Sequence, residues 1–146
     1  MESQFLSGES GVIHVARCDQ KIASCYNRLG DGEKALDRAR LALDVFETAH
    51  DHRRQIITLF EYSKALDLLE DYEEALATLD QVLTTASEEE PRDFEFIVDI
   101  ESQIASILRK VNREEEAIEI ERRLSSVRAI LADDESSDES SDSGDN

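Results

Sequence analysis

The chain has 146 residues, which is enough for one domain with a hydrophobic core and short for two. Its 35 acidic and 16 basic residues give a net charge of −19, which repels the phosphates of nucleic acids and of anionic membranes. No apolar run reaches the roughly 20 residues of a membrane span, and the start MESQFLSGES lacks the basic and apolar parts of a signal peptide. We therefore expect a cytoplasmic protein with neither nucleic acid nor membrane as a partner.

Residues 1–10 predict either the end of a preceding helix or a disordered segment. In the first case Phe5 and Leu6 would pack and Gly8 would end the helix, before a break at Ser10 and Gly11. This chain would then be the last stretch of a longer helical array.

From residue 11 to residue 131, apolar residues recur every three or four positions, and the chain has a single proline. This period predicts helix throughout and gives no support to strands. Breaks fall at residues 10–11, 29–32, 49–52, 70–71, 88–93 and 111–113, so we expect an all-α fold of six helices of about 16 to 20 residues.

Two cysteines fall in the first of these segments, at Cys18 and Cys25. Seven helical residues separate them by about 10 Å along the axis, which is beyond the reach of a disulfide. We interpret them as small buried apolar residues, since a metal-binding pair would need histidines at ligand spacing nearby. His50 and His52 flank Asp51 in a connector and are interpreted as loop polarity.

Three short stretches repeat, LGDGEKAL at 29–36, LEDYEEAL at 69–76 and VNREEEAI at 111–118. Their alanines Ala35, Ala75 and Ala117 are spaced by 40 and then 42 residues, a period that indicates an array of helix pairs. Two antiparallel helices cross closely only over small residues. Each repeat supplies such a pair, Ala23 with Ala35, Ser63 with Ala75, and Ala105 with Ala117.

The repeated stretches predict turns between helices. Gly30 and Asn112 suit the left-handed conformation that ends a helix, whereas Glu70 at the same place suits it less well. Asp31 and Asp71 then stand where an N-cap is wanted. A phosphate-binding loop would need Gly-x4-Gly-Lys-Ser/Thr after a strand, which is missing.

The C-terminal residues 133–146 hold seven acids, no base and no apolar side chain. Such a segment cannot bury enough surface to fold, so we expect a disordered acidic tail at 132–146. The rest of the chain keeps 28 acids and 16 bases, a net charge of −12. Serines among the acids, such as Ser136 with Glu139 three places on, suit acidophilic kinases, so the tail is either regulatory or only solubilising.

Together the three units resemble tetratricopeptide (TPR) repeats. The resemblance is carried by Ala23, Tyr26, Gly30, Ala35, Ala39 and Ala42 in the first unit, by Tyr72, Ala75 and Leu79 in the second, and by Ala105, Leu108 and Ala117 in the third. It implies a right-handed α-solenoid of about three antiparallel hairpins over residues 11–131, with repeats at about 14–50, 53–89 and 93–131. The period of 40 to 42 is nearer to the long-helix subtype of the family than to its usual 34. The family implies a non-catalytic scaffold that binds a protein or peptide in a groove lined by the first helix of each pair.

By this analogy the groove-facing residues are Arg17, Gln20, Ser24, Asn27, Arg28, Lys64, Asp67, Arg109 and Lys110, together with Ile57, Phe60, Leu68, Asp99, Ser102 and Ser106. Five of these fifteen are basic and two are acidic, which favours an acidic or C-terminal peptide as ligand. The family's carboxylate clamp for chaperone tails is not matched, because its positions fall on Gln20, Ser24 and Glu61.

The last helix is apolar for a terminal one, with Ile118, Ile120, Val127, Ile130 and Leu131. Either these residues pack on their own repeat, or part of the face is a partner contact, which leaves a homodimer open. The alternative function is therefore a structural or oligomerisation element, the C-terminal part of a longer TPR array of a regulator. No Ser/His/Asp ordering, ligand cluster or nucleotide loop is visible, so we expect no enzyme, no cofactor and no metal.

Overall fold

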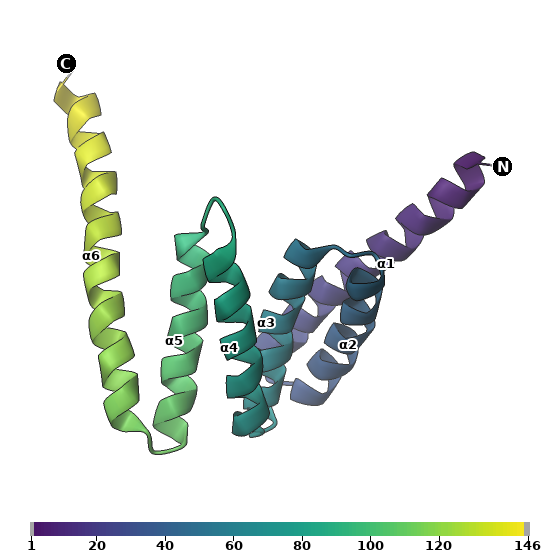
Figure 1. Ribbon diagram of the computed structural model, residues 1–146, viewed down its shortest axis with the longest axis horizontal. Helices are drawn as coiled ribbons and strands as arrows, with labels where there is room; N and C mark the ends of the chain where they lie inside the picture. The colour runs from purple at the N-terminus through teal and green to yellow at the C-terminus, as the bar shows by residue number, and fades with distance from the viewer. Residues whose placement is uncertain (1, 145–146) are drawn as a thin grey trace. The chain divides into compact units, whose positions relative to one another are not determined.

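The structure, a computed structural model, describes the backbone of residues 2–144 and the side chains of residues 11–134. It contains six helices, α1 (Glu2–Leu29), α2 (Gly32–Thr48), α3 (His52–Leu68), α4 (Tyr72–Glu88), α5 (Phe94–Lys110) and α6 (Glu114–Gly144) (Figure 1). No strand occurs among the described residues, so the prediction of an all-α fold of six helices is confirmed.

The four inner helices have 17 residues each, within the expected range, but the two outer ones are longer. Helix α1 has 28 residues and passes through Ser10 and Gly11 without interruption, so the predicted break there is wrong. A single glycine costs a helix only about 1 kcal/mol, which two flanking helical stretches can outweigh.

Helix α6 has 31 residues and runs to Gly144, past residue 132, where composition predicts disorder. That prediction rested on the lack of apolar side chains. A helix that continues from Glu114 forms its backbone hydrogen bonds within itself, so it does not need apolar side chains to extend. Ser136 and Glu139 lie outside the residues whose side chains are described, so their role as a kinase site stays a prediction.

The chain divides into two compact units, Met1–Ile100 and Glu101–Asn146. In the first, α1 packs on α2, α2 on α3, and α3 on α4, and α1 also contacts α3 (Figure 1). The second contains the rest of α5 and all of α6, joined by the turn at Asn112.

Alanines occupy the centre of the helix contacts, as the repeat pattern predicts. Ala23, Ala35 and Ala75 are fully buried, as is Ser63, and in the second unit Ala105 and Ala117 are 2% and 0% exposed. Larger side chains fill the space beside these contacts, such as Phe46, which packs with Ala16 and Ala42. Close approach of the backbones and filling by a few large residues together give the dense interior that folded proteins require.

Gly32 belongs to the stretch that the sequence predicts to be a turn, but its role is in helix packing. It is the buried first residue of α2, and a Cβ atom placed on it would lie 3.0 Å from the Cβ of Leu68 and 3.1 Å from the carbonyl oxygen of Ala65. The start of α2 therefore lies directly against the end of α3.

Four helices end in the same way, with one residue in the left-handed conformation. These residues are Gly30 (φ 81), His50 (φ 55), Glu70 (φ 63) and Asn112 (φ 64). Each is followed by an amide that donates back to the helix, as when Asp71 N donates to the Leu66 carbonyl at 2.9 Å. The predictions for Gly30 and Asn112 are confirmed, and Glu70 adopts the same conformation despite its side chain.

Aspartates at the N-caps explain where α2, α3 and α4 begin. Asp31 accepts a hydrogen bond from Lys34 N at 3.2 Å, as predicted, whereas Asp71 occupies the N-cap of α4 without a side-chain hydrogen bond. Asp51, which lies between the two histidines interpreted as loop polarity, caps α3 by accepting a hydrogen bond from Arg54 N at 3.2 Å.

We expect Ala75→Leu to lower the free energy of unfolding by about 1–3 kcal/mol, because it overfills a close helix contact. Ala77→Leu is the matched control, since Ala77 is exposed on the same helix. Thermal and urea unfolding followed by circular dichroism measure both, and equal stability of the two variants would contradict the packing described for α4.

We expect Glu70→Gly to stabilise the protein. A side chain in the left-handed conformation costs roughly 1–2 kcal/mol, and part of that gain is offset by the larger backbone entropy of glycine in the unfolded chain. The net increase should be about 0.5–1 kcal/mol in urea unfolding, whereas Gly30→Ala should lower stability. A loss of stability in Glu70→Gly would show that the conformation at this turn is not strained.

Candidate functional site

Helices α1 and α3 bring several of the predicted groove residues together through a residue that the prediction did not include. Asn27 Nδ2 donates to the carbonyl oxygen of Glu61 and to its Oε2, both at 2.9 Å. The Nζ atom of Lys64 lies 3.6 Å from Glu61 Oε1. Glu61 thus connects Asn27 on one helix with Lys64 on the other.

Aromatic rings continue this contact toward α5. Lys64 Nζ lies 4.4 Å from the centre of the Phe60 ring, a distance at which the cation is attracted by the ring face. Phe60 in turn meets the edge of Phe96, with ring centres 5.5 Å apart. We call Asn27, Phe60, Glu61, Lys64 and Phe96 the Glu61 cluster.

Asn27 is the most constrained member of the Glu61 cluster. Both partners of its Nδ2 are acceptors, which fixes the orientation of the amide. Its Oδ1 is buried and has no hydrogen-bond partner in the part of the chain that the structure describes. Leaving such a group unsatisfied costs about 1–3 kcal/mol, so the position is held by the packing of α1 on α3.

The other predicted groove residues of the first unit differ in exposure. Arg17 and Arg28 are exposed, and among the described residues neither forms an ion pair. Gln20, Ser24 and Asp67 are half-buried. The cationic character that the sequence predicts therefore resides mainly on α1, because Glu61 compensates Lys64.

Arg109 and Lys110 lie at the end of α5 in the second unit, and both are exposed. Arg109 Nε and Nη2 donate to Glu121 Oε1 and Oε2 at 2.9 and 2.6 Å, and Nη1 lies 3.9 Å from Glu114. These hydrogen bonds raise the pKa of Arg109 and lower the pKa of Glu121.

The predicted apolar residues of α6 fall into two groups. Ile120, Val127 and Leu131 are half-buried and continue a stripe with buried Ala117 and Leu124, whereas Ile118 and Ile130 are 43% and 63% exposed. Arg123 pairs with Glu101 at 3.3 Å, and Arg128 donates to Ser102 Oγ at 2.9 Å, so the same helix also holds α5 by polar contacts.

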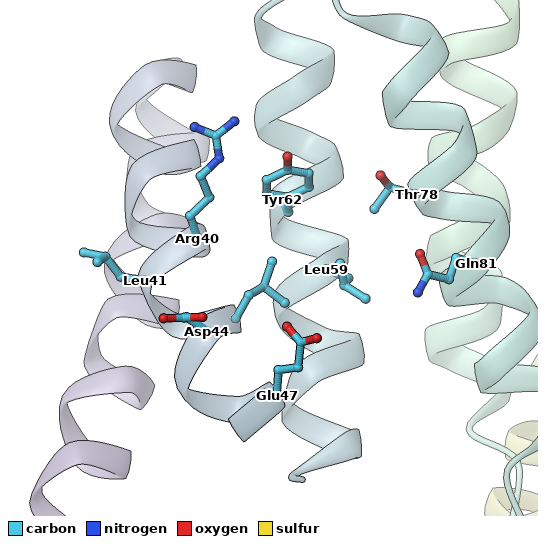
Figure 2. Close-up of a pocket in the computed structure, with 9 residues that line it drawn as sticks. Arg40, Leu41, Asp44, Glu47, Leu59, Tyr62, Thr78 and Gln81 are labelled. Atoms are coloured by element: carbon cyan, nitrogen blue, oxygen red, sulfur yellow. The ribbon is translucent and has the colours of Figure 1, made fainter. Parts of the chain in front are cut away.

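A shallow hollow of ≈ 500 Å³ lies between α2, α3 and α4. Figure 2 shows Arg40, Asp44 and Glu47 on α2, Leu59 and Tyr62 on α3, and Thr78 and Gln81 on α4 around this hollow. Sequence reasoning missed it, because three separate helices form its wall.

Cys18 and Cys25 are both exposed free thiols, so their interpretation as buried apolar residues is wrong. In a helical array, burial of a residue on one helix depends on the neighbouring helix and not on the residue type alone. Within the described residues no group of three or more His, Cys, Asp or Glu is placed to hold a metal ion. No helix of the described chain has both the length and the apolar character to cross a membrane.

Comparisons with known proteins agree with this architecture. The fold is similar to the crystal structure of the TPR domain of Arabidopsis FLU, with a TM-score of 0.69 and 18% sequence identity over 80% of this chain and 97% of that chain. A search of curated proteins found no significant match. The family model of the tetratricopeptide repeat matches residues 15–88, just over half of the chain. The chain therefore belongs to the tetratricopeptide repeat family, and its fold is an all-α solenoid of helix hairpins. Such domains are typically non-catalytic and bind other proteins.

We expect the Glu121 carboxyl to titrate below its ordinary range, as the hydrogen bonds from Arg109 lower its pKa. Because the folded pKa is depressed, this pair stabilises the second unit above the unfolded pKa, and the contribution is lost as pH falls through the folded value. Carbon-detected NMR titration of Glu121 measures the pKa, and Arg109→Gln should return it to the ordinary range. An unshifted Glu121 in the unaltered chain would contradict the pairing.

Proposed function

We propose that the chain is a non-catalytic interaction scaffold, and that the surface formed by α1 and α3 binds an acidic segment of a partner protein. The observation that carries the proposal is that Arg17 and Arg28 on α1 are exposed and form no ion pair among the described residues. Lys64 on α3 adds a cation that lies over the Phe60 ring and is partly compensated by Glu61. On a chain of net charge −19, an acidic partner is repelled by most of the molecule and attracted at these positions.

The Glu61 cluster suits this function because it supplies a rigid base. Phe60 is 8% exposed, and the Glu61 side chain is 12% exposed, so neither needs to rearrange on binding. A preorganised surface loses less entropy on association than a flexible one. The Lys64 side chain, at 36% exposed, can reach a ligand carboxylate while its stem stays on the ring.

The alternative, an oligomerisation element that packs through α6, has less support. Ile118 and Ile130 are twelve residues apart, which places them about 120° apart around a helix and not on one stripe. Ile120, Val127 and Leu131 are already half-buried.

The test uses peptides selected from a random library displayed on phage against the full chain. We expect the selected peptides to be rich in Asp and Glu, and the double variant Arg17→Glu, Lys64→Met to bind them about fivefold more weakly, as two exposed ion pairs would imply. The control is Arg40→Glu with Arg53→Met, which changes the net charge equally at residues outside the predicted groove set. Equal weakening in both double variants, or selected peptides without acidic residues, would overturn the proposal.

A further inference from the structure

Helix α1 carries an uncovered apolar stripe on another of its faces. Val15, Cys18, Ile22, Cys25 and Leu29 follow one another at spacings of three and four, which places them on one side of a helix. Val15 is 59% and Leu29 78% exposed, both thiols are exposed, and Ile22 is half-buried. We call these five residues the α1 seam.

Two of the same positions of the next repeat are fully buried. With the repeat period of 40, the counterparts of the α1 seam on α3 are Gln55, Thr58, Tyr62, Ala65 and Leu69. Thr58 and Ala65, the counterparts of the two cysteines, are both 0% exposed. The covering helix is α2, since its Gly32 lies against the Ala65 carbonyl and its side chains share a hollow with Tyr62 (Figure 2). In this fold, therefore, the seam positions are where the preceding helix packs.

Helix α6 of a second copy of this chain is poorly suited to pack on the α1 seam. Helix α2 meets α3 from the side that carries Gly32, Leu36, Ala39 and Leu43, and the repeat alignment assigns Glu114, Ile118, Glu121 and Ser125 of α6 to those positions. Only Ile118 among them is apolar, and Glu121 is engaged by Arg109.

Charge argues against a second copy of α1 as well. Lys21 and Arg28 directly precede Ile22 and Leu29 and are exposed at the edge of the seam. The one acid between residues 11 and 29 is Asp19, which is 7% exposed and bonded to Arg38 at 2.9 Å. Two such helices side by side would bring like charges together, whereas an acidic helix would find opposite charges.

We propose that the α1 seam binds an acidic amphipathic helix of a partner protein, in the place that α2 has on α3. The partner helix carries apolar residues at spacings of three and four, flanked by Asp or Glu. Its binding covers Cys18 and Cys25, as Thr58 and Ala65 are covered within the chain.

The α1 seam shares no residue with the Glu61 cluster, and the acidic-segment surface of the proposed function has only Arg28 in common with the edge of the seam. Variants at Val15 and Leu29 test the seam alone, whereas Arg17 and Lys64 test the other surface.

The experiment uses a capped synthetic peptide of residues 71–90 as a defined probe. This segment contains α4, an amphipathic helix of this fold that has acids and no Lys or Arg. Alkylation of the full chain by N-ethylmaleimide, followed by mass spectrometry, measures the accessibility of Cys18 and Cys25. We expect saturable protection of both thiols by the peptide and no protection by the same peptide with its acids changed to Lys.

The double variant Val15→Gln, Leu29→Gln keeps both thiols. It should weaken binding of the peptide at least about tenfold, because it removes two apolar contacts. Leu41→Gln with Ile130→Gln, at 55% and 63% exposed, is the matched control and should bind as the unaltered chain does. Circular dichroism verifies that each variant is helical. Three results would overturn the proposal: no protection by the peptide, equal weakening in both variants, or protection that rises with the concentration of the chain alone, which would identify a second copy as the occupant.

Discussion

The structure depends on how closely two helix backbones can approach. Where the helices of a hairpin face each other, the chain places alanine or serine, and Ala23, Ala35, Ser63 and Ala75 are without exposed surface. A methyl or hydroxymethyl group holds neighbouring helices near the minimum separation, so that a few large residues such as Phe46 fill the remaining space. The short turns with one left-handed residue then need to span only a small gap.

This constraint gives the molecule its surfaces. In a linear array each helix contacts mainly its neighbours in sequence, as α1 to α4 do, so every inner helix has one face toward the preceding helix and one toward the next. The first helix keeps the former face uncovered, and on α1 that face holds two thiols and three apolar residues. The Glu61 cluster lies elsewhere, where α1 and α3 meet and where a carboxylate is shared between an amide and an ammonium group.

Local sequence signals predicted much of the fold because helix period, capping and turn preference are local properties. The ends at Gly30 and Asn112 and the cap at Asp31 follow from residue type. Glu70 shows where this reasoning fails, since the helix pair imposes the left-handed conformation on a residue that disfavours it. The long α1 could not be predicted from Gly11, because the two helical stretches on either side decide its conformation.

The candidate sites were less predictable, because each depends on a contact between helices. The basic groove positions were identified by analogy. Glu61 and Lys64 are three residues apart on α3, a spacing that suggests their pairing from the sequence, whereas the contacts of Glu61 with Asn27 and of Glu121 with Arg109 appear only when the helices are assembled. The cysteines were predicted to be buried, as their counterparts Thr58 and Ala65 in α3 are, but both are exposed.

The central claim is that paired small residues set the spacing of each hairpin, and a double-mutant cycle at Ala23 and Ala35 tests it most directly. Urea unfolding should show that Ala35→Leu is less destabilising in the presence of Ala23→Gly than alone, with a coupling of roughly 0.5–3 kcal/mol, because the removed methyl group makes room for the added side chain. Additive effects of the two substitutions would contradict the account, since they would mean that the two positions do not limit the same contact.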